Sequence, residues 1–89
     1  MLKEENYKMA KEHRVLLYRS VSCPWCHKTE EFLNEHKIKF TNIWVDKDIK
    51  AAHEMIKKSG QMGVPVTDID GTIVVGYDVN SFKKLLEIK

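Results

Sequence analysis

The sequence has no long apolar run, no block of like charge, no repeat and only two cysteines among its 89 residues. A membrane span needs about 18 or more consecutive apolar residues, and the chain has no such stretch. Its first eight residues lack the hydrophobic segment that directs secretion. We therefore expect a cytoplasmic protein. In such a reducing compartment, cysteines serve catalysis or metal binding more often than permanent cross-linking.

Charge of neither sign dominates the chain, which has 15 lysine and arginine residues against 13 aspartate and glutamate residues and a net charge of +2. This balance gives no support for nucleic acid or an anionic membrane as the main partner. The length suits one compact domain. We expect a polar N-terminal extension over residues 1–12 and a single domain over residues 13–89, with a monomer as the default state.

Short apolar runs alternate with helical patterns along this domain. Compact apolar runs predict strands, and apolar residues that recur every three or four positions predict helices. Two apolar runs joined by Asp70-Gly71 are a strong hairpin signal. The expected elements are strands over 14–18, 39–45, 64–69 and 72–75, and helices over 24–36, 49–59 and 78–89. The order β-α-β-α-β-β-α predicts an α/β thioredoxin-like fold, with a mixed four-stranded sheet flanked by three helices.

The two cysteines lie three positions apart in Cys23-Pro24-Trp25-Cys26, where the first strand gives way to a helix. Unpaired N–H groups in the first turn of a helix favour a thiolate at Cys23. Cys26, one turn further on, is placed to attack a mixed disulfide formed on Cys23. We predict thiol–disulfide exchange, with Cys23 as the nucleophile, Cys26 as the resolving thiol and Trp25 beside the substrate groove.

Packing residues or half of a zinc site are the alternatives for this pair. A structural zinc site usually takes four protein ligands. No two of the four histidines have the spacing of about three to five residues that zinc fingers use. We therefore expect no metal at the cysteines.

A proline after the second predicted helix marks a candidate binding segment. In Gly63-Val64-Pro65-Val66 the proline begins a strand, where this topology places a cis-proline loop. Such a loop would offer the backbone of Val64 to a substrate peptide. A proline at the end of a strand is the plainer alternative.

A second candidate segment, Gly76-Tyr77-Asp78, precedes the last predicted helix. Gly76 permits a close approach of the backbone to a ligand, and Tyr77 is expected to form a wall of the site. Asp78 either accepts a hydrogen bond from an ammonium group of a ligand or caps the helix.

Together these segments resemble the glutaredoxin family over residues 14–88. The cysteine motif is similar to the family's C-P-Y-C, residues 63–65 to its T-V-P, and residues 75–78 to its G-G-x-D. The stretch 59–71 resembles more particularly a bacterial glutaredoxin-like subgroup. The resemblance implies reduction of protein disulfides or glutathione mixed disulfides, with glutathione as co-substrate and electron donor and no tightly bound cofactor.

The resemblance also implies how glutathione would lie in the groove. Val64 would pair with the backbone of its cysteine. Tyr77, by its N–H, and Asp78, by its side chain, would hold the γ-glutamyl end. Gln61 matches a polar or basic family position near the glycine carboxylate.

Three positions depart from the family pattern. The family's lysine three residues before the first cysteine is Ser20 here, and the adjacent Arg19 would replace it if its side chain turns inward. Val75 stands for the first glycine of G-G-x-D, and Gly63 for the threonine of T-V-P. The donor is therefore glutathione or, alternatively, a thioredoxin-reductase-type flavoprotein of the kind that serves redoxins coupled to ribonucleotide reductase. A glutathione-dependent iron–sulfur carrier is a further alternative, which Pro24 disfavours.

Overall fold

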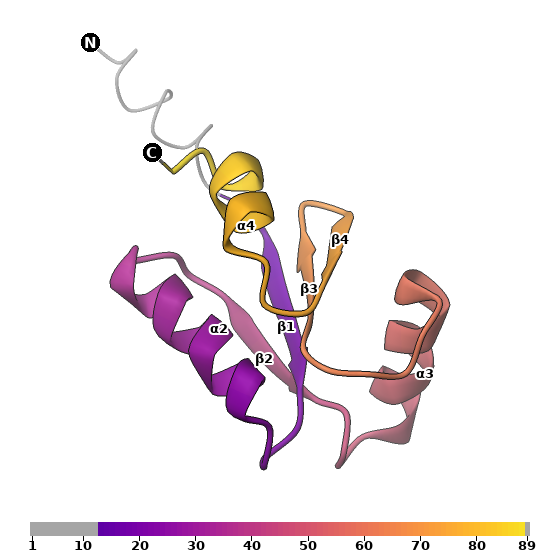
Figure 1. Cartoon of the computed structure of the whole chain (residues 1–89). Coiled ribbons are helices and arrows are strands. Elements are labelled where there is room, and N and C mark those ends of the chain that lie inside the picture. Colours follow the sequence, from indigo (N-terminus) through magenta and orange to yellow (C-terminus); the bar gives the residue numbers. More distant parts are fainter. Residues whose placement is uncertain (1–12, 89) are drawn as a thin grey trace, which may run out of the picture.

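The computed structural model describes residues 13–88, so the expected N-terminal extension and Lys89 lie outside the described residues. Figure 1 shows a sheet between two helical layers, with α2 (Pro24–Glu35) and α4 (Val79–Leu85) on one face and α3 (Ile49–Ser59) on the other. None of the helices within residues 13–88 is long and apolar enough to cross a membrane.

The four strands are β1 (Val15–Arg19), β2 (Thr41–Trp44), β3 (Val66–Ile69) and β4 (Thr72–Val75). They lie in the order β2-β1-β3-β4 across the sheet. β1 pairs in parallel with β2 and antiparallel with β3, which in turn pairs antiparallel with β4. Sheet and helices together confirm the predicted thioredoxin-like α/β fold.

Aspartate side chains begin two of the helices. Asp48 accepts hydrogen bonds from the N–H groups of Lys50 and Ala51 at 3.1 and 3.3 Å, and Asp78 accepts from Ser81 at 3.2 Å. Each bond satisfies a backbone donor that the first turn of a helix leaves unpaired. The predicted starts of α3 and α4 are therefore confirmed.

The last helix is shorter than the predicted span of 78–89, because the chain turns after Leu86. Glu87 has a left-handed backbone with a φ of 60°. Ile88 then donates its N–H back to the carbonyl of Lys83 at 2.9 Å. This closing pattern ends a helix and satisfies one of its last carbonyl groups.

The sheet has an apolar core on each face. The core under α2 and α4 consists of Val15, Phe32, Leu33, Ile69, Val74, Phe82 and Leu86. The core under α3 is smaller and consists of Tyr18, Met55 and Val66. The rings of Phe32 and Phe82 lie 5.4 Å apart, so α2 and α4 pack directly against each other. This packing fixes α2, which carries the cysteine pair, on the sheet.

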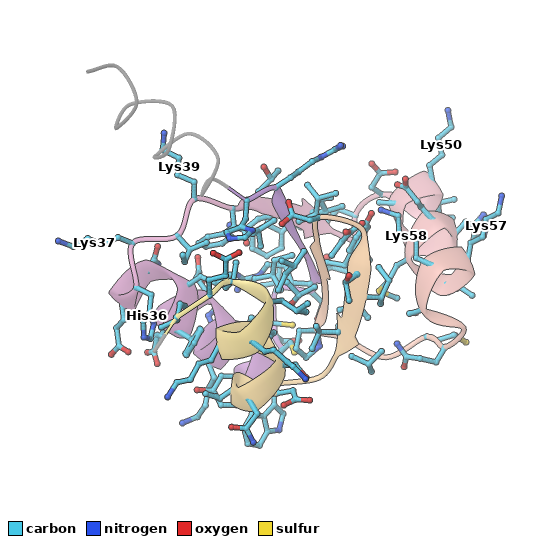
Figure 2. The ribbon with its side chains drawn as sticks, turned by 90° about the horizontal axis from the view of Figure 1, so that it is seen from above. His36, Lys37, Lys39, Lys50, Lys57 and Lys58 are labelled. Carbon is cyan, nitrogen blue, oxygen red and sulfur yellow. The ribbon has the colours of Figure 1, made fainter. Side chains whose placement is uncertain are left out.

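One lysine of α3 pairs with buried polar groups of the sheet. Nζ of Lys58 donates to the carboxylate of Asp68 and to the hydroxyl of Tyr18, each at 2.8 Å. Asp68 and Tyr18 are both buried, so the ammonium group neutralises a carboxylate that water hardly reaches. Figure 2 shows Lys50 and Lys57 pointing outward from the same helix, whereas Lys58 turns toward the sheet.

The hairpin between β3 and β4 turns at Asp70 and Gly71, as the sequence predicts. Both residues have a positive φ, of 53° and 96°, which is the pattern of a type I′ turn. The carboxylate of Asp70 accepts from the backbone N–H of Arg14 at 2.8 Å and contacts the ring of His13. These contacts tie the hairpin to the start of β1.

Candidate active site

Cys23 lies between β1 and α2, at the N-cap position of the helix. Its Sγ accepts a hydrogen bond from the backbone N–H of Cys26 at 3.2 Å, and such a bond favours negative charge on the sulfur. Pro24 is the first helical residue, where a missing N–H breaks no helical bond. These local contacts suit the predicted role of Cys23 as the nucleophile.

Cys26 lies one turn further along α2 and is fully buried. Burial raises the pKa of its thiol to about 12, and the hydrogen bond and charge of Cys23 act in the same direction. The backbone N–H of Ser20 and the charge of Arg19 lower the pKa, but by less. In the reduced protein Cys26 is therefore protonated at neutral pH. The Cys23 sulfur, in contrast, accepts a backbone N–H bond.

The loop before β3 brings its backbone to the nucleophile. The peptide bond between Val64 and Pro65 is cis, the isomer that the topology predicts at this position. The Cys23 thiol donates to the carbonyl of Val64 at 3.9 Å. Gly76, with a φ of 85°, donates its N–H to the carbonyl of Pro65 at 2.9 Å. The two predicted binding segments thus meet next to Cys23.

A cavity of about 290 Å³ opens beside this loop and forms the groove of the site. It is lined by Trp25, Val64, Pro65, Gly76 and Tyr77, all of which the sequence analysis singles out. The rings of Trp25 and Tyr77 lie 5.8 Å apart and remain 55% and 37% exposed. Two exposed aromatic rings at a concave surface indicate a contact surface for a ligand.

Gln61 and Asp78 both make contacts within the protein. Oε1 of Gln61 accepts from the N–H of Gly63 at 2.7 Å, and its Nε2 donates to the carbonyl of Gly63 at 3.0 Å. The carboxylate of Asp78 accepts from the backbone and the hydroxyl of Ser81 at 3.2 and 2.8 Å. The cap that the sequence offered as an alternative for Asp78 is therefore present, and the glutathione contacts of both side chains stay predictions.

Neither Arg19 nor Ser20 is among the residues that line the groove. Arg19 is the last residue of β1 and is 1% exposed, and its guanidinium forms an ion pair with Glu30 of α2 at 2.8 Å. The side chain turns inward, as the sequence analysis required for a glutathione contact, but it meets Glu30 rather than the groove. The patterns in the sequence do not predict this ion pair. Its signal in the sequence is an arginine at the end of an apolar strand and an acidic residue one helical turn after Cys26.

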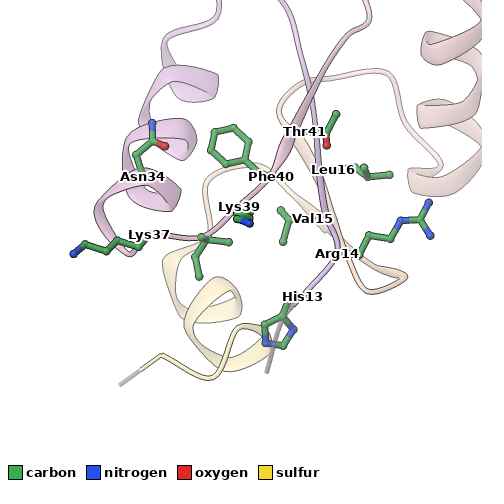
Figure 3. Close-up of a pocket in the computed structure, with 10 residues that line it drawn as sticks. His13, Arg14, Val15, Leu16, Asn34, Lys37, Lys39, Phe40 and Thr41 are labelled. Atoms are coloured by element: carbon green, nitrogen blue, oxygen red, sulfur yellow. The ribbon is translucent and has the colours of Figure 1, made fainter. Parts of the chain in front are cut away.

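A larger cavity, of about 930 Å³, lies at the other end of β1. Figure 3 shows it around Val15 and Phe40, with Arg14 and Lys37 pointing away to opposite sides. No predicted site residue lines this cavity, because Cys23 follows the opposite end of the strand. Within residues 13–88, no group of three or more histidine, cysteine or acidic side chains is placed to hold a metal ion.

Comparisons with known proteins agree with the fold and the cysteine pair. The Glutaredoxin family model matches residues 15–74. A glutaredoxin-like 8.6 kDa protein in the rubredoxin operon of Clostridium pasteurianum is 42% identical over 73 residues, which cover 82% of this chain and 97% of that protein. Glutaredoxin 3 of Escherichia coli (strain K12) is 33% identical over 64 residues, which cover 72% of this chain and 77% of that protein.

A solved structure extends the likeness to three dimensions. The glutaredoxin (grx-1) from Archaeoglobus fulgidus superposes with a TM-score of 0.75 and 34% sequence identity, over 81% of this chain and 84% of that chain. The matched region includes both cysteines, which the structure places at the start of α2 as free thiols. From the family match, the identities and the site, the chain belongs to the glutaredoxin family of thiol–disulfide oxidoreductases.

Proposed function

We propose that the protein reduces protein disulfides and glutathione mixed disulfides, with glutathione as its electron donor. The observation that supports this most is the setting of the Cys23 sulfur. It accepts an N–H bond at 3.2 Å and lies 3.9 Å from the carbonyl of Val64, which lines the groove. A disulfide that enters the groove therefore meets the nucleophile and an aromatic contact surface at the same place.

The proposed reaction consists of two thiol–disulfide exchanges. The Cys23 thiolate attacks one sulfur of the substrate disulfide, and the other sulfur leaves as a thiolate that takes up a proton. Cys26 then loses its proton to solvent and attacks the Cys23 sulfur, which releases the second thiol and forms the Cys23–Cys26 disulfide. Two molecules of glutathione return this disulfide to the dithiol and become one molecule of glutathione disulfide.

Two parts of the groove support glutathione as the donor, namely the backbone of Val64 and the segment that ends in the carboxylate of Asp78. A tripeptide lying beside the cis peptide would pair its cysteine backbone with Val64. Its γ-glutamyl end would then reach the N–H of Tyr77 and the carboxylate of Asp78, which is exposed at the start of α4. The aromatic rings of Trp25 and Tyr77 would flank the peptide.

A thioredoxin-reductase-type flavoprotein is a second candidate donor, and a different observation supports it. Ser20 stands where the resemblance implies a lysine, and the guanidinium of Arg19 is held by Glu30 inside the fold. Neither residue offers a cation for the glycine carboxylate of glutathione. A protein donor needs no such contact, because its disulfide is presented by a folded surface.

A pair of coupled assays separates the two donors. A glutathione mixed disulfide is the substrate, and NADPH consumption is followed first with glutathione and its reductase, and then with thioredoxin reductase alone. We expect turnover in the first system. Turnover only in the second system contradicts glutathione as the donor.

Two variants test the roles of the cysteines in these assays. Cys23→Ser should abolish turnover with either donor, because no nucleophile remains. Cys26→Ser should keep the reduction of glutathione mixed disulfides, because a second glutathione can resolve the intermediate in place of Cys26. A Cys26→Ser protein that is inactive toward these substrates contradicts this role of glutathione.

The proposal implies a cellular setting as well. Reduced glutathione sets the thiol–disulfide balance of the cytoplasm, so the proposed reaction requires that compartment. The partners are then glutathione and disulfide-containing proteins, with the protein acting as a monomer.

A further inference from the structure

The guanidinium of Arg19 is a buried charge that has no role in the exchange reaction described above. It is 1% exposed at the end of β1. Its Nη1 lies 2.8 Å from the carboxylate of Glu30 on α2 and donates to Oδ1 of Asn42 on β2 at 3.2 Å. The group stacks over the ring of Trp44, 4.5 Å from its centroid. A charged group held from three sides in this way has a fixed position.

This guanidinium lies beside the turn of α2 that carries Cys26. Residues four apart on a helix are neighbours on its surface, so Cys26 and Glu30 share one face of α2. Nη2 of Arg19 also lies 3.3 Å from Nδ1 of His27, the residue after Cys26. On the strand side, the backbone N–H of Ser20, the residue after Arg19, acts to lower the pKa of the Cys26 thiol. The guanidinium therefore contacts the residues one and four positions after Cys26 on α2, and its own residue directly precedes Ser20.

The other charged groups near this sulfur are more exposed to water than Arg19. The side chains of Glu30 and His27 are 31% and 57% exposed. Asp46 follows β2 and accepts from the N–H of Val21 at 3.2 Å, in the loop before the cysteines. Water and salt screen exposed charges more than buried ones, so the field at Cys26 is weighted toward the guanidinium.

We propose that Arg19 is a positioning residue whose buried charge favours the thiolate of Cys26 in the resolving step. In that step Cys26 gives its proton to solvent, its sulfur attacks the Cys23 sulfur of the mixed disulfide, and the substrate thiolate leaves with the electron pair of the broken bond. The rate depends on the fraction of Cys26 that is ionised, and a nearby fixed cation raises this fraction. The inference rests on the role of Cys26 in the proposed function.

The resolving step can be isolated with the aromatic disulfide 5,5′-dithiobis(2-nitrobenzoic acid). The Cys23 thiolate attacks this reagent and releases one coloured thiolate at a rate that depends on reagent concentration. Cys26 then attacks the mixed disulfide and releases a second coloured thiolate at a rate that does not. Stopped-flow absorbance of the full chain at several pH values therefore gives the pH profile of the second phase alone.

Two variants should change the second phase in opposite directions. Arg19→Met removes the cation and should slow the phase about threefold at pH 7, because an increase of about one pKa unit lowers the ionised fraction tenfold while the more basic thiolate is more nucleophilic. Glu30→Gln removes the opposing carboxylate but keeps an oxygen that accepts from Arg19, and should speed the phase about threefold. The pH profile should move to higher pH in the first variant and to lower pH in the second.

Arg19→Lys is the conservative control, because it keeps the charge and loses the planar fork. Its second phase should stay close to that of the parent and clearly faster than that of Arg19→Met. If Arg19→Lys is as slow as Arg19→Met, or if Glu30→Gln slows the phase or leaves it unchanged, the inference is wrong. Glu30→Gln decides the question by itself if replacement of Arg19 prevents folding.

The number of coloured thiolates separates this inference from the proposed function. If each protein releases two coloured thiolates but the second phase has the same rate in the Arg19 and Glu30 variants, the role of Arg19 is contradicted. The resolving role of Cys26 is then still supported. Release of one per protein contradicts the resolving role of Cys26, and the inference about Arg19 fails with it.

Discussion

In the reduced protein at pH 7, an alkylating reagent should label Cys23 and leave Cys26 almost untouched. Burial raises the pKa of the Cys26 thiol to about 12, against about 8.5 for an ordinary cysteine. At pH 7 the ionised fraction is then about 10⁻⁵ for Cys26 and about 3% for an ordinary cysteine, which is a ratio of about 3,000.

The greater nucleophilicity of a more basic thiolate offsets part of this ratio. With a Brønsted coefficient of about 0.4–0.5, as thiolate attack on disulfides shows, a pKa difference of about 3.5 makes the Cys26 thiolate about 40-fold more reactive. The two factors together leave Cys26 about 80-fold slower than an ordinary cysteine. Cys26 is also fully buried, and this adds steric protection.

The assay supplies less iodoacetamide than protein, so that the share of label on each cysteine reports the ratio of their rates. Tandem mass spectrometry locates the label, and we expect about 1% of it on Cys26 in the native protein and about half in urea. In Cys23→Ala, the hydrogen bond and charge that raise the Cys26 pKa are gone, so Cys26 should react faster than in the parent. A tenth or more of the label on Cys26 of the native protein would refute the reasoning.

Two further predictions concern stability. Lys37 lies just beyond the C-cap of α2 with a φ of 56°, so Lys37→Gly should raise the free energy of unfolding in urea by about 0.5–1 kcal/mol. Lys39→Gly, outside the left-handed region, is the control, and an equal change in both variants contradicts the prediction. The Arg14 N–H and His13 lower the pKa of Asp70, and a lowered pKa contributes stability above the unfolded pKa of about 3.9 that is lost at lower pH. Thermal melts should therefore show Asp70→Asn less stable than the parent at pH 7, with a gap that narrows as the pH falls below about 3.9, and a gap that does not narrow counts against the carboxylate's role.

Features with local causes could be predicted from the sequence. The hairpin at Asp70 and Gly71 follows from residues that accept a positive φ, and both do so in the structure. Cys23 at the start of α2 follows from an apolar strand, a proline at the first helical position and a helical pattern after it. Each of these depends on a few consecutive residues, so no distant contact was needed to place them.

Features that depend on distant contacts were not predicted. Arg19 follows an apolar run and was expected at the site, yet it is buried because Glu30 and Asn42 arrive from two other elements. The position of the β3–β4 hairpin beside β1 was likewise not predicted, because the choice between sheet edges is made by packing and not by any one strand. The early end of α4 depends on a left-handed Glu87, for which the sequence has no glycine as a signal.

The pairing of Gln61 with the backbone of Gly63 couples the conformations of these two positions. A Cβ at residue 63 would stand 2.9 Å from Oε1 of Gln61, closer than a side-chain carbon and an amide oxygen can approach. A larger residue at 63, such as the threonine of the T-V-P pattern, must therefore displace the Gln61 amide from the loop. The residue at 63 thus decides whether this glutamine closes its own loop or extends toward a ligand.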